Sequence, residues 1–510
     1  MSRAEPVAAS GVSGVAAVEL ERISFRYPGT DRPAIDRLTL KVEAGETLVL
    51  LGRSGSGKTS LLRVIEGSLD PSEGRVRRAG RACLVYQDRR LVSQRSVLEN
   101  ATSGALRERG AFALRASSAQ KERAHEILAD LGLGEVASRR VSTLSGGLLQ
   151  RVAIARALCA EPAVLLADEP LASLDPSNAE RVLDVLERLQ RKYGFSLILT
   201  MHEVAVAERR FSRIEVVESG RLRPFTGSPA ASELEEQKEP EQERSLDSRI
   251  KALPGAGVMM AALVAALLLA AVGLNLRGFV PGKFLPSLWQ FLSGLLPSSW
   301  AAVAAMPFAQ LFWSLIETIQ MAVLGTAAGI VVALPLAIFA SDQTAAPSVR
   351  VPTRLLLNGI RTIPSIFWAL IFVALVGLGP AAGVGALAAY SVGYLTKFFY
   401  EALEDVDPRP ARALEGLGLS RFQSFVLALW PASQPAVAAA CFFVLEYNSR
   451  GASVLGVVGA GGIGQDLMYY FDYREFPTAA LGLLMVLAVV VALDLVSQRL
   501  RRTLSMRRGQ

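Results

Sequence analysis

Residues 52–59 read GRSGSGKT, and this stretch decides the fold of the first half of the chain. It fits the pattern G-x-x-x-x-G-K-[ST] and lies between an apolar strand, Thr47–Leu51, and a helical run, Ser60–Glu66. Glycines let backbone N–H groups approach phosphate oxygens, and the start of a helix adds partial positive charge. The sequence therefore predicts a nucleotide phosphate loop in an α/β domain.

Within this loop the last two residues have distinct predicted roles. We expect the Lys58 ammonium to hold the β and γ phosphates and the Thr59 hydroxyl to ligate Mg²⁺. The predicted nucleotide-binding residues of the loop are Gly52, Arg53, Ser54, Gly55, Ser56, Gly57, Lys58 and Thr59.

An acidic pair follows a second apolar strand, Val164–Ala167. Asp168 suits the coordination sphere of Mg²⁺, and Glu169 is placed to polarise the water that attacks the γ-phosphate. Together with the phosphate loop, this pair predicts Mg²⁺-dependent hydrolysis of ATP.

Charge is divided unevenly along the chain. Residues 1–252 carry 73 Asp, Glu, Lys or Arg residues, whereas residues 253–510 carry 28. A soluble domain is about 25% charged, so the first half is ordinary and the second is depleted. This division excludes a wholly soluble enzyme, a disordered protein and a nucleic-acid binder, and it predicts a membrane domain in the second half.

We therefore expect four segments. Residues 1–17 are a weakly patterned lead-in, residues 18–226 alternate strands with helices, residues 227–254 form a linker, and residues 255–510 form the membrane domain. The linker holds the stretch 232–251, in which 11 of 20 residues are charged. That composition is typical of a solvated tether, with a regulatory element as the alternative.

Six apolar runs predict an all-α membrane domain of about six spans. Residues 257–276 carry no charge over 20 residues, which suffices to cross a bilayer core of about 30 Å. The other five runs are 314–340, 363–380, 381–399, 433–449 and 477–497. Six spans leave twelve basic residues of this half in cytosolic segments, among them Arg350, Arg354 and Arg361, and four outside. The N-terminal half and the C-terminus are then both cytosolic.

Three parts of this topology stay open at the level of sequence. The long run 363–399 must be divided near residues 377–385. The Gly-rich stretch 451–468 either spans or re-enters the membrane. Residues 284–296 form either an amphipathic helix at the outer surface or part of a longer first span.

Between the phosphate loop and the acidic pair, residues 144–151 read LSGGLLQR. This stretch resembles the signature LSGGQ of the ATP-binding-cassette family, with Leu148 where glutamine is usual. The resemblance implies that Ser145, Gly146 and Gly147 bind ATP, and that the departure at Leu148 affects ATP affinity.

Further motifs of that family occur in the expected order, and the resemblance implies a role for each. Tyr27 in FRYPG would stack on adenine, Gln87 in VYQD would sense Mg²⁺ and couple to the membrane domain, Asp175 would belong to the D-loop, and His202 would contact the γ-phosphate. The implied catalytic residues are Glu169, His202 and Gln87, and the implied Mg²⁺ residues are Thr59, Gln87 and Asp168.

Members of this family complete each ATP site with the signature of a second cassette. This chain supplies one phosphate loop and one signature, so we expect a homodimer with two composite ATP sites.

The stretch 401–431 resembles the coupling loop of ATP-binding-cassette importers. Aligning its glycine and proline places Gly418 and Pro431 at those positions and Arg412 and Ala413 at the start of the family's EAA motif. The resemblance implies two short helices around a glycine turn, docked on the ATPase domain, in a type I importer fold.

Residues 360–468 resemble the permeases of phosphonate-type importers, a group that includes phosphite and hypophosphite transporters, and residues 91–100 resemble their cassettes. ATPase and permease, normally separate chains, are here fused. The resemblance implies ATP-driven import of a phosphorus oxyanion across the bacterial inner membrane, with a separate external binding protein and membrane lipid as partners. An exporter of a hydrophobic substrate and a non-transporting mechanochemical complex are the alternatives.

Charged residues in the membrane domain are the candidates for a substrate pathway. Arg450 could attract an oxyanion, with Glu446 and Asn448 beside it. The alternative is a structural i,i+4 pair between Glu446 and Arg450.

Overall fold

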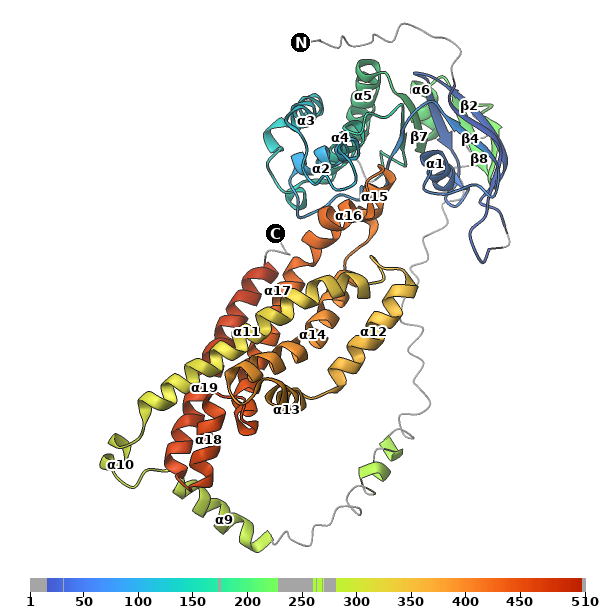
Figure 1. The fold of residues 1–510 in the computed structure, drawn as a ribbon. Helices are drawn as coiled ribbons and strands as arrows, with labels where there is room; N and C mark the ends of the chain where they lie inside the picture. Colours follow the sequence, from blue (N-terminus) through green and yellow to red (C-terminus); the bar gives the residue numbers. More distant parts are fainter. Residues whose placement is uncertain are drawn as a thin grey trace.

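The computed structural model describes residues 16–227 except 31 and 173–175, residues 260–269 except 263 and 268, and residues 281–506. An N-terminal domain (residues 16–227) of strands and helices lies at one end of a helical domain (residues 281–506) whose long helices extend away from it (Figure 1). The predicted lead-in up to residue 15, the linker from residue 228 to 254, Asp175 and more than half of the predicted first span 257–276 lie outside the described residues. The domain boundaries therefore stay a prediction.

Two sheets build the N-terminal domain. The larger has the strand order β5-β6-β7-β3-β8-β9, parallel except for the β8–β9 pair, and the smaller is antiparallel in the order β2-β1-β4. The strands are β1 (Ala16–Phe25), β2 (Ile35–Glu43), β3 (Thr47–Leu51), β4 (Glu73–Arg78), β5 (Ala82–Val85), β6 (Val164–Ala167), β7 (Ser196–Met201), β8 (Ile214–Glu218) and β9 (Arg221–Pro224).

Helices cover the larger sheet, and every residue of β5, β6 and β7 is buried, as parallel strands require. The helices are α1 (Lys58–Glu66), α2 (Val97–Ser103), α3 (Ser118–Asp130), α4 (Gly146–Leu158), α5 (Pro176–Tyr193) and α6 (Val204–Arg210), with 3₁₀ turns η1 (Leu106–Arg109), η2 (Gly134–Val136) and η3 (Val141–Thr143). The α/β fold is confirmed, and the strands predicted before the phosphate loop and before the acidic pair are β3 and β6.

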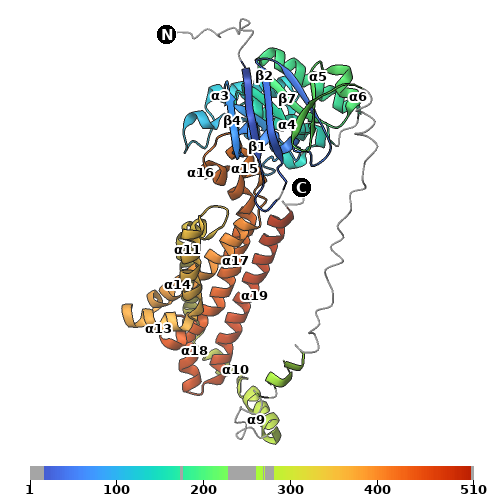
Figure 2. The same cartoon turned by 90° about the vertical axis from the view of Figure 1, so that its right-hand side faces the viewer.

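Long helices form the second domain, in which α11 packs along α14, and both pack against α17 (Figures 1 and 2). Its elements are α9 (Pro281–Gly294), α10 (Trp300–Ala304), α11 (Phe308–Ala340), α12 (Pro347–Thr362), α13 (Ser365–Val376), α14 (Pro380–Glu404), α15 (Arg409–Gly416), α16 (Arg421–Ser424), the π-helical turn η6 (Phe425–Leu429), α17 (Trp430–Leu455), the 3₁₀ turn η7 (Gly456–Val458), α18 (Ile463–Asp472) and α19 (Phe476–Met506). A helical membrane domain is thus confirmed.

Among the described residues, three helical stretches are long and apolar enough to cross a membrane, or four if the bent pair α12–α13 counts as one span. The three are Phe308–Ala340, Arg421–Val458 and Phe476–Arg499, which contain the predicted spans 314–340, 433–449 and 477–497. The predicted span 381–399 lies within α14, which has 25 residues but is not among the three.

The predicted span 363–380 is wrong as a single straight span. Its helix α13 has 12 residues, about 18 Å at 1.5 Å per residue, because Pro364 precedes it and Gly377 and Gly379, with φ of 98° and 126°, end it. Instead α13 continues α12 across a bend of 86°. Arg350, Arg354 and Arg361 accordingly lie on α12 and not in a cytosolic loop.

The Gly-rich stretch 451–468 does not form an additional span. The helix α17 continues to Leu455, a turn follows, and α18 has 10 residues, about 15 Å, which is half the thickness of a bilayer core. Residues 281–294 form the helix α9, which covers most of the segment 284–296; the preceding residues 270–280 lie outside the described residues.

Candidate functional site

The phosphate loop connects β3 to α1 as predicted, and two of its glycines are required by close backbone approaches. Gly52 has φ of 151°, and a Cβ there would lie 2.4 Å from the Val217 carbonyl oxygen. Gly57 has φ of 108°, and a Cβ would lie 2.3 Å from the Ala34 carbonyl oxygen. No other residue type fits either position without moving the backbone.

Lys58 begins α1 and folds back over this loop. Its ammonium donates to the carbonyl oxygens of Gly52 (2.6 Å) and Arg53 (3.0 Å), and the residue is only 4% exposed. Burial lowers the pKa of Lys58, while the nearby carboxylates of Glu169 and Asp168 raise it. A phosphate bound at this loop would add negative charge beside the buried Lys58 ammonium, whose positive charge faces two carbonyl oxygens and the nearby carboxylates of Glu169 and Asp168.

The predicted Mg²⁺ residues of the loop and of the second strand meet here. Asp168 follows β6, is 4% exposed, and accepts hydrogen bonds at Oδ1 from the hydroxyls of Thr59 (3.2 Å) and Thr200 (3.0 Å). Burial raises the pKa of Asp168, and the two hydroxyls lower it. The Ser56 hydroxyl, in the loop itself, is buried without a hydrogen-bond partner. Hydroxyl and carboxylate oxygens are the ligands that Mg²⁺ prefers, so the residues fit a Mg–nucleotide complex.

Glu169 brings the three predicted catalytic residues together. Its Oε2 accepts a hydrogen bond from Gln87 Nε2 (2.8 Å), and its Oε1 lies 2.5 Å from His202 Nε2. Its backbone N–H donates to the Thr200 hydroxyl, and it adopts φ of 45°, which is rare for a residue other than glycine. The hydrogen bond from His202 holds the pKa of Glu169 below its ordinary value, against the effect of burial. Glu169 therefore stays ionised and able to accept a proton from water.

Two predicted nucleotide contacts lie at the edges of this arrangement. The Tyr27 hydroxyl is 3.1 Å from the hydroxyl of Ser60 in α1, and its exposed ring meets Phe25 edge-on. Ser145 is the residue before α4, and both Ser145 and Gly146 are exposed. Leu148 is half-buried and packs against the apolar core of the domain, which explains why an apolar residue is accepted at that position.

A docking segment, residues 409–429, joins the helical domain to the N-terminal domain. It comprises α15, α16 and η6, and Figure 2 shows α15 and α16 against the N-terminal domain. Its apolar side chains belong to the same buried cluster as the core of that domain. The buried members are Ala411, Leu414, Leu417, Leu419, Leu427, Ala428 and Leu429. The two short helices predicted around a glycine turn are present, and Gly418 at that turn has φ of 84°.

Polar contacts hold the docking segment against residues 110–113 and Arg95 of the N-terminal domain. The Gln423 amide donates to the carbonyl oxygens of Gly110 (3.0 Å) and Ala113 (2.7 Å), and the Ser420 hydroxyl donates to that of Ala111 (2.6 Å). On the other side, Arg95 Nε donates to the Leu427 carbonyl oxygen at 2.8 Å.

Pro431 explains why the Leu427 carbonyl accepts this bond. Leu427 lies in the π-helical turn η6, just before α17. The residue that would donate to its carbonyl in an α-helix is Pro431, which has no N–H. The Arg95 guanidinium, only 20% exposed, takes the place of the missing donor. The proline of the predicted coupling motif thus creates an acceptor for a side chain of the other domain.

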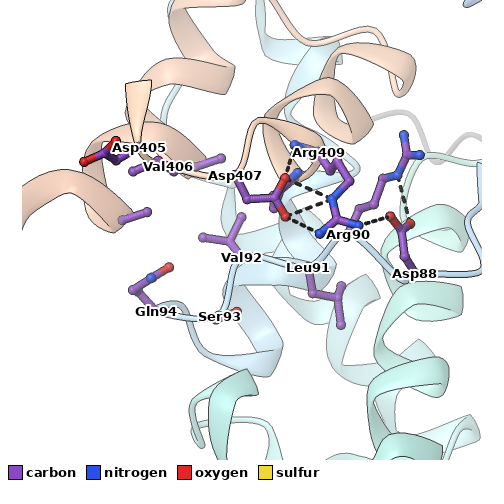
Figure 3. A pocket seen from close by; sticks show the side chains of 13 residues that line it. Asp88, Arg90, Leu91, Val92, Ser93, Gln94, Asp405, Val406, Asp407 and Arg409 are labelled. Carbon is purple, nitrogen blue, oxygen red and sulfur yellow. Dashed lines mark hydrogen bonds and ion pairs between the residues drawn. The ribbon is translucent and has the colours of Figure 1, made fainter. Parts of the chain in front are cut away.

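A cavity of about 370 Å³ lies between the two domains at this contact (Figure 3). At its edge Arg409 pairs with Asp88 across the domain boundary (3.1 Å) and with Asp407 on its own side (2.9 Å). Arg412, expected at the family's glutamate position, is exposed, while Ala413 is buried against the N-terminal domain. Within the part of the chain that the structure describes, the ion pair across the domain boundary is therefore made by Arg409 and not by Arg412.

The buried Arg156 of α4 connects the signature helix to this contact. Its guanidinium donates to the carbonyl oxygens of Arg90 (2.7 Å) and Arg89 (3.1 Å), in the segment that follows Gln87. One continuous set of contacts therefore runs from the helix behind Ser145, through residues 87–95, to the docking segment.

The predicted pathway residues on α17 have structural contacts. Asn448 is fully buried, and its amide donates to the hydroxyls of Thr326 in α11 (2.8 Å) and Ser391 in α14 (2.7 Å). Arg450 pairs with Glu446 one turn away, as the alternative interpretation expected. Sequence reasoning missed Arg95 and Arg409 as contacts, although both lie in stretches that it singled out for their resemblance.

Comparison with known proteins finds a matching family for each of the two domains. Residues 35–172 match the family described as ABC transporter, and residues 333–508 match the family described as binding-protein-dependent transport system inner membrane component. The phosphonates import ATP-binding protein PhnC 1 of Pseudomonas aeruginosa is 40% identical over 222 residues, covering 39% of this chain and 79% of that protein. Its namesake in Natronomonas pharaonis is 42% identical over 201 residues, covering 38% and 86%.

Solved structures were also matched. A nucleotide-free ATP-binding cassette from an ABC transporter is 23% identical, with a TM-score of 0.39, over 43% of this chain and 95% of that one. A dimeric, post-hydrolysis ATP-binding cassette bound to ADP and Pi is 27% identical, with a TM-score of 0.37, over 41% and 100%.

The phosphate loop, the acidic pair and the docked helical domain define an ATPase that drives a membrane protein. With the two family matches, they define an ATP-driven importer in which ATPase and permease are fused. The chain belongs to the ABC transporter family, and its N-terminal domain is a relative of the phosphonates import ATP-binding proteins.

Proposed function

We propose that this importer carries a phosphorus oxyanion, namely a phosphonate, phosphite or a related anion. The observation that carries the proposal is the 40% identity of its N-terminal domain to a phosphonates import ATP-binding protein, over 79% of that relative. The match of residues 333–508 to binding-protein-dependent permeases supports a separate external binding protein as the source of the anion. The same match speaks against an exporter, which has no use for such a protein.

The loop residues would bind the triphosphate of ATP in the way their geometry allows. Lys58 would exchange its two carbonyl contacts for the β and γ phosphates, and the N–H groups of the loop would hold phosphate oxygens. Thr59 and Asp168, whose side chains already share a hydrogen bond, would hold Mg²⁺ together with Gln87. Bound Mg²⁺ would neutralise charge that develops on the phosphate oxygens.

Glu169 would act as the general base for hydrolysis. Its depressed pKa keeps it ionised, and its contacts with Gln87 and His202 hold the carboxylate at the end of β6. A water between this carboxylate and the γ-phosphate would lose its proton as it attacks. Gln87 begins the segment 87–95, which contacts the docking segment. A change in the hydrogen bond between Gln87 and Glu169 would therefore be transmitted through this segment to the helical domain.

A second copy of the chain would complete each ATP site. Ser145 and Gly146 are exposed at the start of α4 and so are available to the nucleotide of a partner cassette, with Gly147 behind them. This arrangement supports a two-fold homodimer. We place it in the bacterial inner membrane, with the ATPase domains and the C-terminus in the cytosol, because basic residues of the second half gather in the segments predicted to be cytosolic.

Reconstitution tests the proposed substrate. The chain in lipid nanodiscs would be mixed with the binding protein encoded nearest to it, and ATP hydrolysis would be measured with phosphonate, phosphite, phosphate or sulfate. We expect one of the phosphorus anions to stimulate hydrolysis severalfold, and sulfate not to. Equal rates with all four anions would reject the proposed substrate class.

A further inference from the structure

Arg361, at the end of α12, lies halfway along the helical bundle. A Cβ on Gly393 of α14 would be 3.3 Å from the Arg361 Cβ and 3.4 Å from its Cα, so the two backbones touch there. Gly393 is about 20 Å from Pro380 and about 17 Å from Glu404, the two ends of α14, at 1.5 Å per residue. Figure 1 shows α12 running beside α14 from the end near the N-terminal domain. Arg361 is therefore near the middle of the membrane-spanning part.

No carboxylate neutralises Arg361 within the part of the chain that the structure describes. Its guanidinium donates to the Asn358 amide oxygen (3.2 Å) and lies 5.8 Å from the centre of the Tyr394 ring. The basic residues Arg354, Lys397 and Arg450 of the same domain each pair with a glutamate. The predicted first span cannot supply a partner either, because residues 252–316 contain no Asp or Glu.

A row of tyrosines continues from Arg361 across α14 to α17. The ring of Tyr394 lies 4.6 Å from that of Tyr390, which stacks on Tyr447 at 5.5 Å. Tyr447 is 48% exposed, and Asn358 beside Arg361 is exposed as well. We call the face formed by Asn358, Arg361, Tyr394 and Tyr447 the mid-membrane polar face; Tyr390, which is buried, packs between its two tyrosines.

This face is unsuited to lipid. An unneutralised guanidinium in hydrocarbon is costly, and such residues face protein or a water-filled path. The helix break between α12 and α13, with its 86° bend, lies directly beside Arg361. Non-helical backbone at membrane depth is likewise tolerated only where it is buried in protein or lines a water-filled cavity. Because the proposed ATP sites need a second chain, a second copy of the helical domain is the natural cover.

We infer that Arg361 binds the transported anion in transit, where the mid-membrane polar faces of two copies meet. Two facing guanidiniums with no carboxylate repel each other unless an anion lies between them. Guanidinium forks match tetrahedral oxyanions, and tyrosine hydroxyls supply further donors. This inference rests on the proposed function for the identity of the anion, and it places the contact at Arg361 and not at Arg450.

Transport by the full-length chain tests the role of charge. The chain would be inserted in vesicles with its ATPase domains facing the bath. The vesicles would enclose the binding protein encoded nearest to the chain and labelled methylphosphonate, phosphite or phosphate, and release of the label into the bath would be measured. We expect Arg361→Gln to slow ATP-dependent transport at least tenfold, with basal ATP hydrolysis within twofold, and Arg361→Lys to recover at least a third of the rate. The control Arg350→Gln, on the same helix, should transport normally. Transport by Arg361→Gln at the unaltered rate, or equal losses in the Gln and Lys variants, would overturn the inference.

Thiol labelling tests whether the position is reached by water. In Arg361→Cys, aminoethyl methanethiosulfonate forms a mixed disulfide with the thiol, releases methanesulfinate and leaves an ammonium, whereas the methyl reagent leaves a neutral group. We expect the charged reagent to react and to restore transport at least fivefold, and the methyl reagent to leave it low. The unaltered chain, treated in the same way, serves as the control for labelling of its native cysteines Cys83, Cys159 and Cys441.

A thiol at position 361 that the charged reagent does not reach would contradict the inference, even if the unaltered chain transports the probe. If the unaltered chain moves none of the three probes, the proposed function fails, while the labelling result still decides whether Arg361 faces a water-filled path.

Discussion

The bond from Arg95 to the Leu427 carbonyl predicts a coupling between two residues of different domains. Arg95→Ala removes the guanidinium that donates to the Leu427 carbonyl oxygen, and Pro431 has no N–H that could donate to it instead. A buried hydrogen bond to a charged group contributes about 1.5–3 kcal/mol, so we expect the docked state to lose about 2 kcal/mol. In the Pro431→Ala background residue 431 regains an N–H that can bond to Leu427, and Arg95→Ala should then cost about 1 kcal/mol less.

Hydrogen exchange of the docking segment measures this cost directly. Exchange of residues 409–424 in the full chain, read by mass spectrometry in nanodiscs, reports the free energy of opening. A loss of about 2 kcal/mol corresponds to about 30-fold faster exchange in Arg95→Ala, because each 1.4 kcal/mol is a factor of ten. The control Arg139→Ala, which removes an exposed arginine of the same domain, should exchange as the unaltered chain does. If Arg95→Ala accelerated exchange equally with Pro431 present and in the Pro431→Ala background, this explanation of the bond would be refuted.

Three further predictions concern the ATP site. Glu169→Gln should abolish ATP hydrolysis but leave ATP binding, measured with a fluorescent nucleotide, and ordinary turnover would rule out Glu169 as the base. Because His202 holds the pKa of Glu169 down, the carboxylate is lost only as pH falls through that depressed value. In His202→Ala the acid limb of the residual ATPase profile should therefore move to higher pH, and an unmoved limb would contradict this. Gly57→Ala should lower ATP affinity at least tenfold, because the new Cβ would lie 2.3 Å from a carbonyl oxygen. Gly55→Ala, where φ is 80° but no atom lies within 4 Å of the new Cβ, should lower ATP affinity less. Equal losses of affinity in the two variants would show that the clash is not the cause.

Local sequence patterns predicted residues that the fold brings together, because these residues stand in short motifs at the ends of buried strands. The strands before Gly52 and Asp168 are parallel members of one sheet, so their carboxyl ends meet and bring Thr59 to Asp168. The convergence of Gln87 and His202 on Glu169 depends on the same geometry.

The helical domain was harder to predict because hydropathy does not show where a helix bends or which face it buries. The division of the run 363–399 near residue 377 was predicted, and it falls at Gly377 and Gly379. The bend between α12 and α13 at Pro364 was not predicted, and it places Arg361 in a helix of the bundle and not in a loop. Likewise, no local pattern indicates that Arg95 reaches a carbonyl 332 residues away. Such contacts depend on how the two domains pack.

The central claim is that ATP hydrolysis at this site moves a phosphorus oxyanion through the helical domain. Vesicles that enclose the binding protein and labelled phosphonate, with ATP added to the bath, test it most directly. The label should leave the lumen only with ATP and the binding protein present, and it should stay inside with the Glu169→Gln chain. ATP hydrolysis without movement of label, or movement that the Glu169→Gln chain supports equally, would contradict the account.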